Sequence, residues 1–177
     1  MDIRNPYPQA DRLTLIPHHG TLIGFAGGSK KLVSGICRVG VGLSITWKGK
    51  GIESYSRGIG PRTDNYNAEM LVTATLAQLC VTIAKKHRIH KVYIFSDNQS
   101  AMETINSPKL CPAQHASLSF RESVRSFLAT DPSRTFIVQW IPEHSRIPGN
   151  ERADHTMKSN RGKFTPNYLG CRGKIKI

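Results

Sequence analysis

The spacing of hydrophobic residues changes twice along this chain, and these changes restrict the fold most. Between residues 39 and 47 apolar residues alternate with Gly, Ser and Thr, the period-2 pattern of a half-buried strand. From residue 68 to about 86 the apolar residues follow helical spacing, and residues 92–95 form a short apolar run typical of a buried strand. Strands on both sides of a long helix predict an α/β fold.

The remaining elements are shorter. Apolar runs bounded by Gly, Pro and polar residues predict strands over residues 22–25, 52–59 and 136–140. Helical spacing predicts helices over residues 100–105, 113–128 and 150–158, the last introduced by Pro148. The expected order is therefore β-β-β-α-β-α-α-β-α.

A chain of 177 residues is long enough for one domain with a core. We expect an extended Pro-rich segment over residues 1–19, the domain over 20–160 and a basic tail over 161–177. Lys and Arg number 25 against 12 Asp and Glu, so the net charge is 25 − 12 = +13. This charge favours a polyanionic partner such as nucleic acid or an acidic membrane surface.

The four cysteines are far apart and form no CxxC pair, which predicts reduced thiols and no zinc site. The first twenty residues are too polar for a signal peptide, and no later run is expected to be apolar enough to span a bilayer. We therefore expect a protein of the cytoplasm or nucleus with no membrane partner. The cysteines are Cys37, Cys80, Cys111 and Cys171.

Three carboxylates, Glu69, Asp97 and Asp154, lie where apolar segments meet a turn or a helix. Open α/β sheets gather functional groups at such places, beyond the ends of their strands. Each acid alone has an ordinary structural explanation: a first-turn acid for Glu69, a helix cap for Asp97 and a solvated helix residue for Asp154. Together they suggest a site for two hard cations that would assist in-line phosphodiester hydrolysis.

Four motifs occur in an informative order. They are Gly27-Gly28-Ser29, Ala68-Glu69, the segment from Phe95 to Ala101 (FSDNQSA), and the segment from Trp140 to Asp154 (WIPEHSRIPGNERAD). In this order they resemble the type 1 ribonuclease H family, including the domains attached to retroelement reverse transcriptases. The last motif is long and specific, whereas Ala-Glu or Ser-Asp alone would mean little. The resemblance covers roughly residues 21–158.

The resemblance implies a ribonuclease H-like fold: a five-stranded mixed sheet, with three antiparallel strands followed by two parallel ones, flanked by helices. It implies Mg²⁺, with Mn²⁺ as a substitute, held by Glu69, Asp97 and Asp154. It also implies that His144, on a loop, assists proton transfer and product release. The expected activity is cleavage of the RNA strand of RNA:DNA hybrids.

The same resemblance suggests how a hybrid would be held. Duplexes of this kind are recognised by shape and by 2′-hydroxyl groups rather than by base sequence. The basic helical handle that some family members carry is not expected between residues 106 and 119. A reverse transcriptase domain in a longer parent polypeptide is a second expected partner. The candidate nucleic-acid contacts are Ser29, Asn65, Asn98, Gln99, Lys30 and Lys31, although turn and cap roles are the alternative for Asn65 and Asn98.

Gly27 stands where the family places an acid that bridges both metal ions. Glycine supplies no ligand, so we expect weak or absent cleavage. Glu143, where the family commonly has a small residue, is a candidate replacement ligand. Two alternatives remain open: a nucleic-acid-binding or protein-interaction module that has lost catalysis, and a natural enzyme in which Gly27 was introduced.

Overall fold

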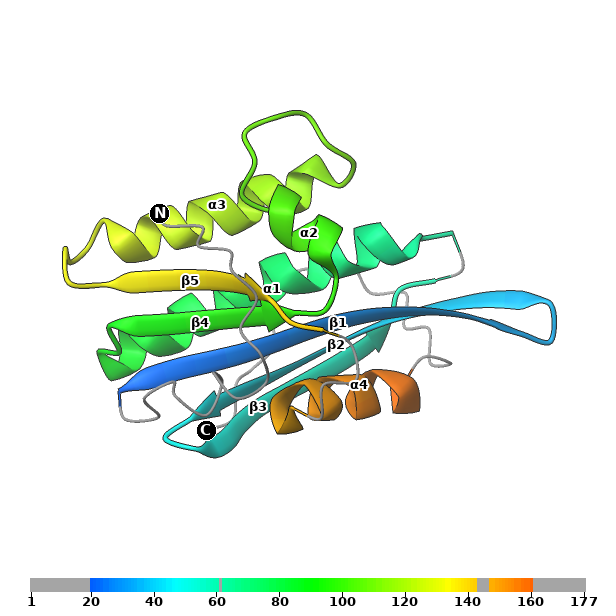
Figure 1. The fold of residues 1–177 in the computed structure, drawn as a ribbon, viewed down its shortest axis with the longest axis horizontal. Helices are drawn as coiled ribbons and strands as arrows, with labels where there is room; N and C mark the ends of the chain where they lie inside the picture. Colours follow the sequence, from blue (N-terminus) through cyan, green and yellow to red (C-terminus); the bar gives the residue numbers. More distant parts are fainter. Residues whose placement is uncertain (1–19, 61, 143–146, 161–177) are drawn as a thin grey trace.

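The structure, a computed structural model, describes residues 20–60, 62–142 and 147–160 (Figure 1). The order of elements matches the predicted β-β-β-α-β-α-α-β-α. In chain order they are β1 (Thr21–Val33), β2 (Ile36–Trp47), β3 (Lys50–Gly58), α1 (Asn65–His87), β4 (Lys91–Ser96), α2 (Gln99–Thr104), α3 (Gln114–Leu128), β5 (Thr135–Trp140) and α4 (Pro148–Asn160).

The five strands form one mixed sheet in the order β3-β2-β1-β4-β5. The first three strands pair antiparallel, and β4 and β5 then run parallel to β1, which confirms the expected fold class. The β1–β4 pairing ends at Ala26 and Ser96. Residues that follow these two positions therefore meet at one edge of the sheet, where open α/β sheets bind ligands.

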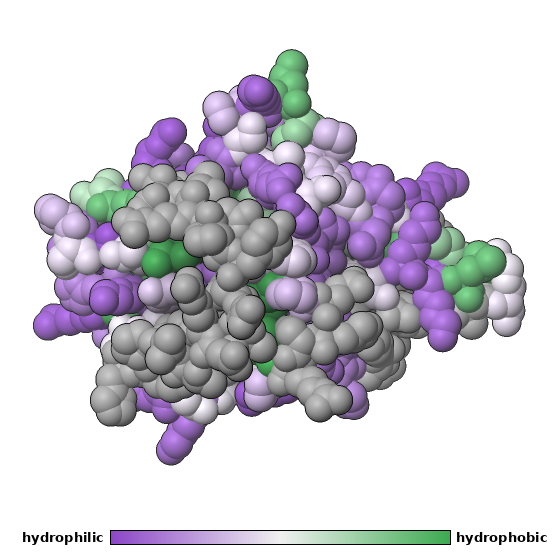
Figure 2. Space-filling model, in the orientation of Figure 1, coloured by the Kyte–Doolittle hydropathy of each residue, from purple (hydrophilic) through white to green (hydrophobic). Residues whose placement is uncertain are grey.

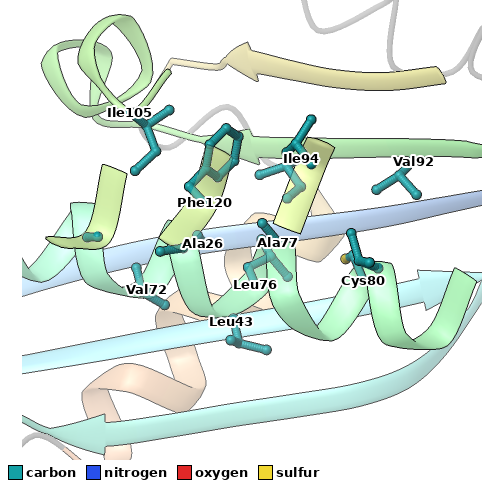
Figure 3. Close-up of a cluster of buried hydrophobic side chains, with 14 of the residues drawn as sticks. Ala26, Leu43, Val72, Leu76, Ala77, Cys80, Val92, Ile94, Ile105 and Phe120 are labelled. Atoms are coloured by element: carbon teal, nitrogen blue, oxygen red, sulfur yellow. The ribbon is translucent and has the colours of Figure 1, made fainter. Parts of the chain in front are cut away.

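Helix α1 packs on one face of the sheet beside α3 and supplies the centre of the larger core (Figure 3). Leu76, Ala77 and Cys80 of α1 are fully buried against the sheet and α3. A Cβ atom at Gly24 of β1 would lie 2.7 Å from Cδ1 of Leu76. The close approach of this helix to the central strand therefore requires glycine.

Helix α4 covers the opposite face over a smaller core that includes Phe25, Phe95 and Ala153. Gly149, near the start of α4, lies against Phe25, and its carbonyl accepts a 2.8 Å hydrogen bond from Oγ of Ser44. These contacts fix α4 over β1 and β2. Figure 1 shows α4 on the side of the sheet away from α1 and α3.

The expectation that no segment is apolar enough to span a bilayer was wrong, because one helix meets the criteria of length and apolar composition for a membrane span. Among the described residues, α1 has the length and the apolar character of a membrane-crossing helix. Most of its most apolar stretch is nevertheless buried inside the fold. The apolar character of α1 is that of the core helix of an α/β domain.

Strand β1 is much longer than the predicted segment 22–25 and continues through Gly27, Gly28 and Ser29 to Val33. Its last residues pair with β2 alone, and the hairpin turns at Ser34 and Gly35, which have φ angles of 51° and 75°. Positive φ at both central residues is the signature of the tight turns that suit twisted hairpins. Residues 30–38 thus form a two-stranded ribbon beyond the rest of the sheet, called the β1–β2 ribbon below (Figure 1).

The other departures are smaller. Helix α1 begins at Asn65 rather than Ala68, because Asp64 accepts a hydrogen bond from the N–H of Asn67 and caps the helix. The described segment between α2 and α3 contains no helix. Cys37, Cys80 and Cys111 are free thiols, and Cys171 lies outside the described residues.

Candidate functional site

Glu69 joins three elements beside the edge where β1 and β4 part. It belongs to the second turn of α1 and is only 1% exposed. Its Oε1 accepts a 2.6 Å hydrogen bond from the backbone N–H of Gly28, and its Oε2 accepts one of 3.4 Å from Oγ of Ser96. Because these partners come from β1 and β4, the carboxyl group is held against the centre of the sheet.

The environment of Glu69 strongly favours its neutral form. Burial is the main cause that raises its pKa to about 8, and the negative charges of Asp97 and then Asp154 add to the rise. The hydrogen bonds from Gly28 and Ser96 act in the opposite direction. The three predicted acids are therefore close enough to interact electrostatically, although they are separated widely in the sequence.

Asp97 directly follows β4, and two other elements fix its position. Nε1 of Trp140, at the end of β5, donates to the backbone carbonyl of Asp97 at 2.9 Å. Nδ2 of Asn150 in α4 lies 3.5 Å from Oδ2 of Asp97. Asp97 is not the helix cap, since Asn98 accepts from the N–H of Ala101 and caps α2.

Gly27 faces Asp154 across the space between β1 and α4. A Cβ atom at Gly27 would lie 3.7 Å from Oδ1 of Asp154 and would meet no other atom of the described residues within 4 Å. The adjacent Gly28 points to the opposite face, where a Cβ atom would lie 3.0 Å from Oε1 of Glu69. A Cβ atom at position 27 would therefore make an ordinary van der Waals contact with Asp154.

The three acids have the ligand type that a metal site needs, but their positions do not form a complete set of ligands. Carboxylate oxygens are the ligands that Mg²⁺ prefers, and a cation would offset the repulsion that Asp97 and Asp154 add to the effect of burial on Glu69. Among the described residues, however, no group of three His, Cys, Asp or Glu side chains is arranged to hold a metal ion. The donor types suit a hard divalent cation, whereas a preformed two-ion site would need a further donor near Gly27.

The candidate nucleic-acid contacts lie around the same edge. Asn98 and Gln99 follow Asp97, and Asn98 performs the cap role that was its structural alternative. Nε2 of Gln99 donates to Glu103 at 2.8 Å on the exposed side of α2. Asn65 is the first residue of α1, and its Oδ1 is buried without a hydrogen-bond partner among the described residues. The cap of α1 is Asp64, so the cap alternative for Asn65 was wrong.

The remaining candidates lie on β1 or outside the described part of the chain. Ser29 is half-buried two residues after Gly27, whereas Lys30 and Lys31 are exposed on the β1–β2 ribbon. His144 and Glu143, the candidate proton-transfer residue and replacement ligand, lie outside the described residues.

The sequence prediction did not assign four groups that hold the acids. They are the N–H of Gly28, the hydroxyl of Ser96, the indole of Trp140 and the amide of Asn150. All four lie inside the motifs already singled out. Their roles depend on contacts between distant segments, so only their position within those motifs could have indicated them.

The arrangement of the sheet and the helices is that of the ribonuclease H-like fold. No protein-family model matches the chain, and no curated protein matches it. Solved structures do match over most of its length. Ribonuclease H1 of the halophilic archaeon Halobacterium salinarum has 16% identity and a TM-score of 0.51, over 78% of this chain and 96% of that chain.

Two further structures show the same fold in different settings. The first is LC11-ribonuclease H1, which was isolated from compost by a metagenomic approach and solved in complex with an RNA/DNA hybrid. It has 16% identity and a TM-score of 0.56, over 78% of this chain and 97% of that chain. The protease-reverse transcriptase of prototype foamy virus has 16% identity and a TM-score of 0.55, over 81% of this chain and 21% of that chain. At these identities the similarity establishes the fold.

Proposed function

We propose that this chain is a ribonuclease H-type domain that acts on the RNA strand of RNA:DNA hybrids. The observation that carries the proposal is the electrostatic interaction of Glu69 with both Asp97 and Asp154, at the edge where β1 and β4 part and where Gly27 faces Asp154. The solved hybrid complex of a protein with the same fold supports it. A reverse transcriptase domain in the parent polypeptide and a location in the cytoplasm or nucleus belong to the same proposal.

The chain's residues would divide the work between metal and substrate. Mg²⁺ or Mn²⁺, when bound, supplies Lewis-acid stabilisation of the phosphodiester and activates water. Asp97, Glu69 and Asp154 would hold the cations, and His144 would assist proton transfer. The exposed lysines would contact phosphates, and the polar groups beside the acids would contact 2′-hydroxyls in the minor groove. These contacts would come from Ser29, Lys30, Lys31, Asn65, Asn98 and Gln99.

The cleavage activity of the chain as it stands should be weak or absent. Gly27 places no carboxylate opposite Asp154, and the described residues hold no three-donor group. Loss of one charged ligand typically removes several kcal/mol of transition-state stabilisation, about 3 kcal/mol or more. The same observation favours a second candidate function: a module that binds nucleic acid or protein on this fold without catalysis.

Cleavage of a labelled RNA:DNA hybrid in Mg²⁺ and in Mn²⁺ tests the proposal. The unchanged chain would be compared with Gly27→Asp, with Gly27→Asn as the uncharged control of the same size, and with Gly27→Asp combined with Asp97→Asn. Because a Cβ atom at position 27 fits beside Asp154 without a clash, the backbone should accept Asp or Asn there. We expect only Gly27→Asp to restore strong cleavage.

Other outcomes identify the alternatives. Cleavage by the unchanged chain that Asp97→Asn abolishes would indicate another ligand in place of the missing acid, with Glu143 the first to replace. Hybrid binding that is equal in Mg²⁺ and in chelator, with no cleavage by any variant, would favour the binding module. If no variant binds or cuts a hybrid, the proposed function is wrong.

A further inference from the structure

The β1–β2 ribbon projects beyond every other strand. The β1–β4 pairing ends at Ala26, and the β2–β3 pairing ends at Gly40, so residues 30–38 form a ladder of two strands only (Figure 1). Two strands alone are marginally stable in water. Figure 2 shows hydrophilic and hydrophobic side chains together at this end of the molecule. Leu32 and Ile36 are 70% and 57% exposed.

Two cations stand directly opposite each other in this ribbon. Lys31 pairs with Arg38 across the strands, and both side chains are exposed. Like charges in this arrangement destabilise an antiparallel pair. The ribbon contains no Asp or Glu, and neither cation makes an ion pair within the described part of the chain. An anion held between the two side chains would remove the repulsion and form charge-assisted hydrogen bonds.

The cationic pair lies on the face of β1 that carries the candidate site. Side chains along a strand alternate between faces, so Gly27, Ser29 and Lys31 share one face, and Gly27 on that face points toward Asp154. The Ser29–Gly40 pair lies between, and it presents no bulky side chain. Lys31 is four residues from Gly27, a distance of about 13 Å at roughly 3.3 Å per residue.

We infer that Lys31 and Arg38 together bind one backbone phosphate of the nucleic acid strand that occupies the candidate site. This inference rests on the proposed function, because it places the phosphate relative to the acids. A separation of about 13 Å corresponds to roughly four nucleotides at about 3.4 Å per nucleotide along a duplex axis. The ribbon is then a second anchor that sets the position of the hybrid at the acids without reading its sequence.

Binding of a fluorescently labelled RNA:DNA hybrid, measured in chelator over a range of salt concentrations, tests the inference separately from catalysis. The test variant replaces Lys31 and Arg38 with Gln. The control variant replaces Lys50 and Lys91 with Gln, since these exposed lysines lie at the opposite end of the sheet. Both variants lose two positive charges.

The test variant should bind the hybrid about fivefold more weakly than the control variant. Its plot of log affinity against log salt should be shallower by about one unit, the change expected for one lost phosphate contact. Equal affinity and equal slope for the two variants would overturn the inference while leaving the proposed function in place. If the unchanged chain does not bind the hybrid, the proposed function fails and the inference fails with it.

A third variant excludes simple unfolding of the ribbon. Lys31→Glu creates an opposite-charge pair with Arg38, which should keep or raise the thermal stability of the protein. The same change should weaken hybrid binding at least as much as the double Gln variant, because it repels the phosphate. A stable Lys31→Glu variant with unchanged hybrid affinity would contradict the inference.

Discussion

The backbone N–H of Gly28 donates a 2.6 Å hydrogen bond to Oε1 of Glu69. This bond joins the middle of β1 to the second turn of α1 across 41 residues of sequence. It also separates the roles of two adjacent glycines: Gly28 supports the buried acid, whereas Gly27 faces Asp154 on the other side of the strand.

The two glycines should therefore respond differently to the same substitution. At Gly28 a Cβ atom would lie 3.0 Å from Oε1 of Glu69 and 3.2 Å from Cβ of Ala68, so Gly28→Ala should push α1 away from β1. We expect a loss of about 1–3 kcal/mol in the free energy of unfolding, the usual cost of overpacking. Gly27→Ala should be close to neutral. Urea unfolding of the two variants checks this, and equal losses would contradict it.

The protonation of Glu69 should make the protein less stable as the pH rises. The pKa of this carboxyl is about 8 in the folded protein, above its ordinary value of 4.5, so the folded state holds the proton more tightly than the unfolded state. Stability is unaffected below about pH 4.5 and should fall between about pH 4.5 and pH 8. Glu69→Gln should flatten this dependence and stabilise the protein at pH 8.

Thermal unfolding in chelator from pH 5 to pH 8.5 measures the effect of Glu69. Glu103→Gln on the exposed side of α2 is the control for loss of an acid elsewhere. A pH dependence that is the same in the unchanged protein and in Glu69→Gln would show that another group is responsible.

Asn98 has two possible roles that its variants can separate. Its Oδ1 caps α2 by accepting from the N–H of Ala101 at 3.0 Å. Asn98→Ala should cost about 1 kcal/mol through loss of the cap, whereas Asn98→Asp should retain the cap. If the amide also contacts the hybrid, Asn98→Asp should weaken hybrid binding without destabilising the protein. Unfolding and binding measurements on both variants distinguish the two roles. If Asn98→Asp binds the hybrid as well as the unchanged protein does, capping of α2 is the only role of Asn98.

Gly149 should be essential for the position of Asp154. A Cβ atom there would clash with the ring of Phe25, so Gly149→Ala must displace α4 from the sheet. We expect a loss of about 1–3 kcal/mol or more. In the Gly27→Asp background, cleavage should also fall. Glu151→Ala, an exposed change in the same helix, is the control for both measurements. Full stability of Gly149→Ala would contradict this account of α4.

The sequence predicted those strands whose apolar residues alternate with small polar ones. Strand β2 was clear because Val39, Val41 and Leu43 alternate with Gly and Ser, whereas β1 was seen only over residues 22–25. The expectation that β2 is only half-buried was wrong, since residues 39–45 are buried on both faces between α1 and α4. The rest of β1 contains Gly27, Gly28 and lysines, which have low strand propensity, and pairing with β2 holds it extended. Tertiary pairing overrode local preference in this strand.

The candidate site could be predicted only in part, because local sequence patterns locate the acids but do not encode the long-range contacts that hold them. The acids could be located because each follows a strand or lies in a helix that the sequence indicates. The contacts that hold them, such as Asn150 with Asp97 or Gly28 with Glu69, join segments separated by 53 and 41 residues. No local pattern encodes such contacts, so the sequence could name the acids without naming what supports them.

The hydrogen bond from Ser44 to the carbonyl of Gly149 spans 105 residues and has a consequence for biosynthesis. Helix α4 is the last described element to leave the ribosome, and it carries Asp154. A nascent chain that ends before α4 has only two of the three acids and lacks the helix that covers Phe25 and Phe95. The site is therefore completed only when α4 has been synthesised and has packed on the sheet.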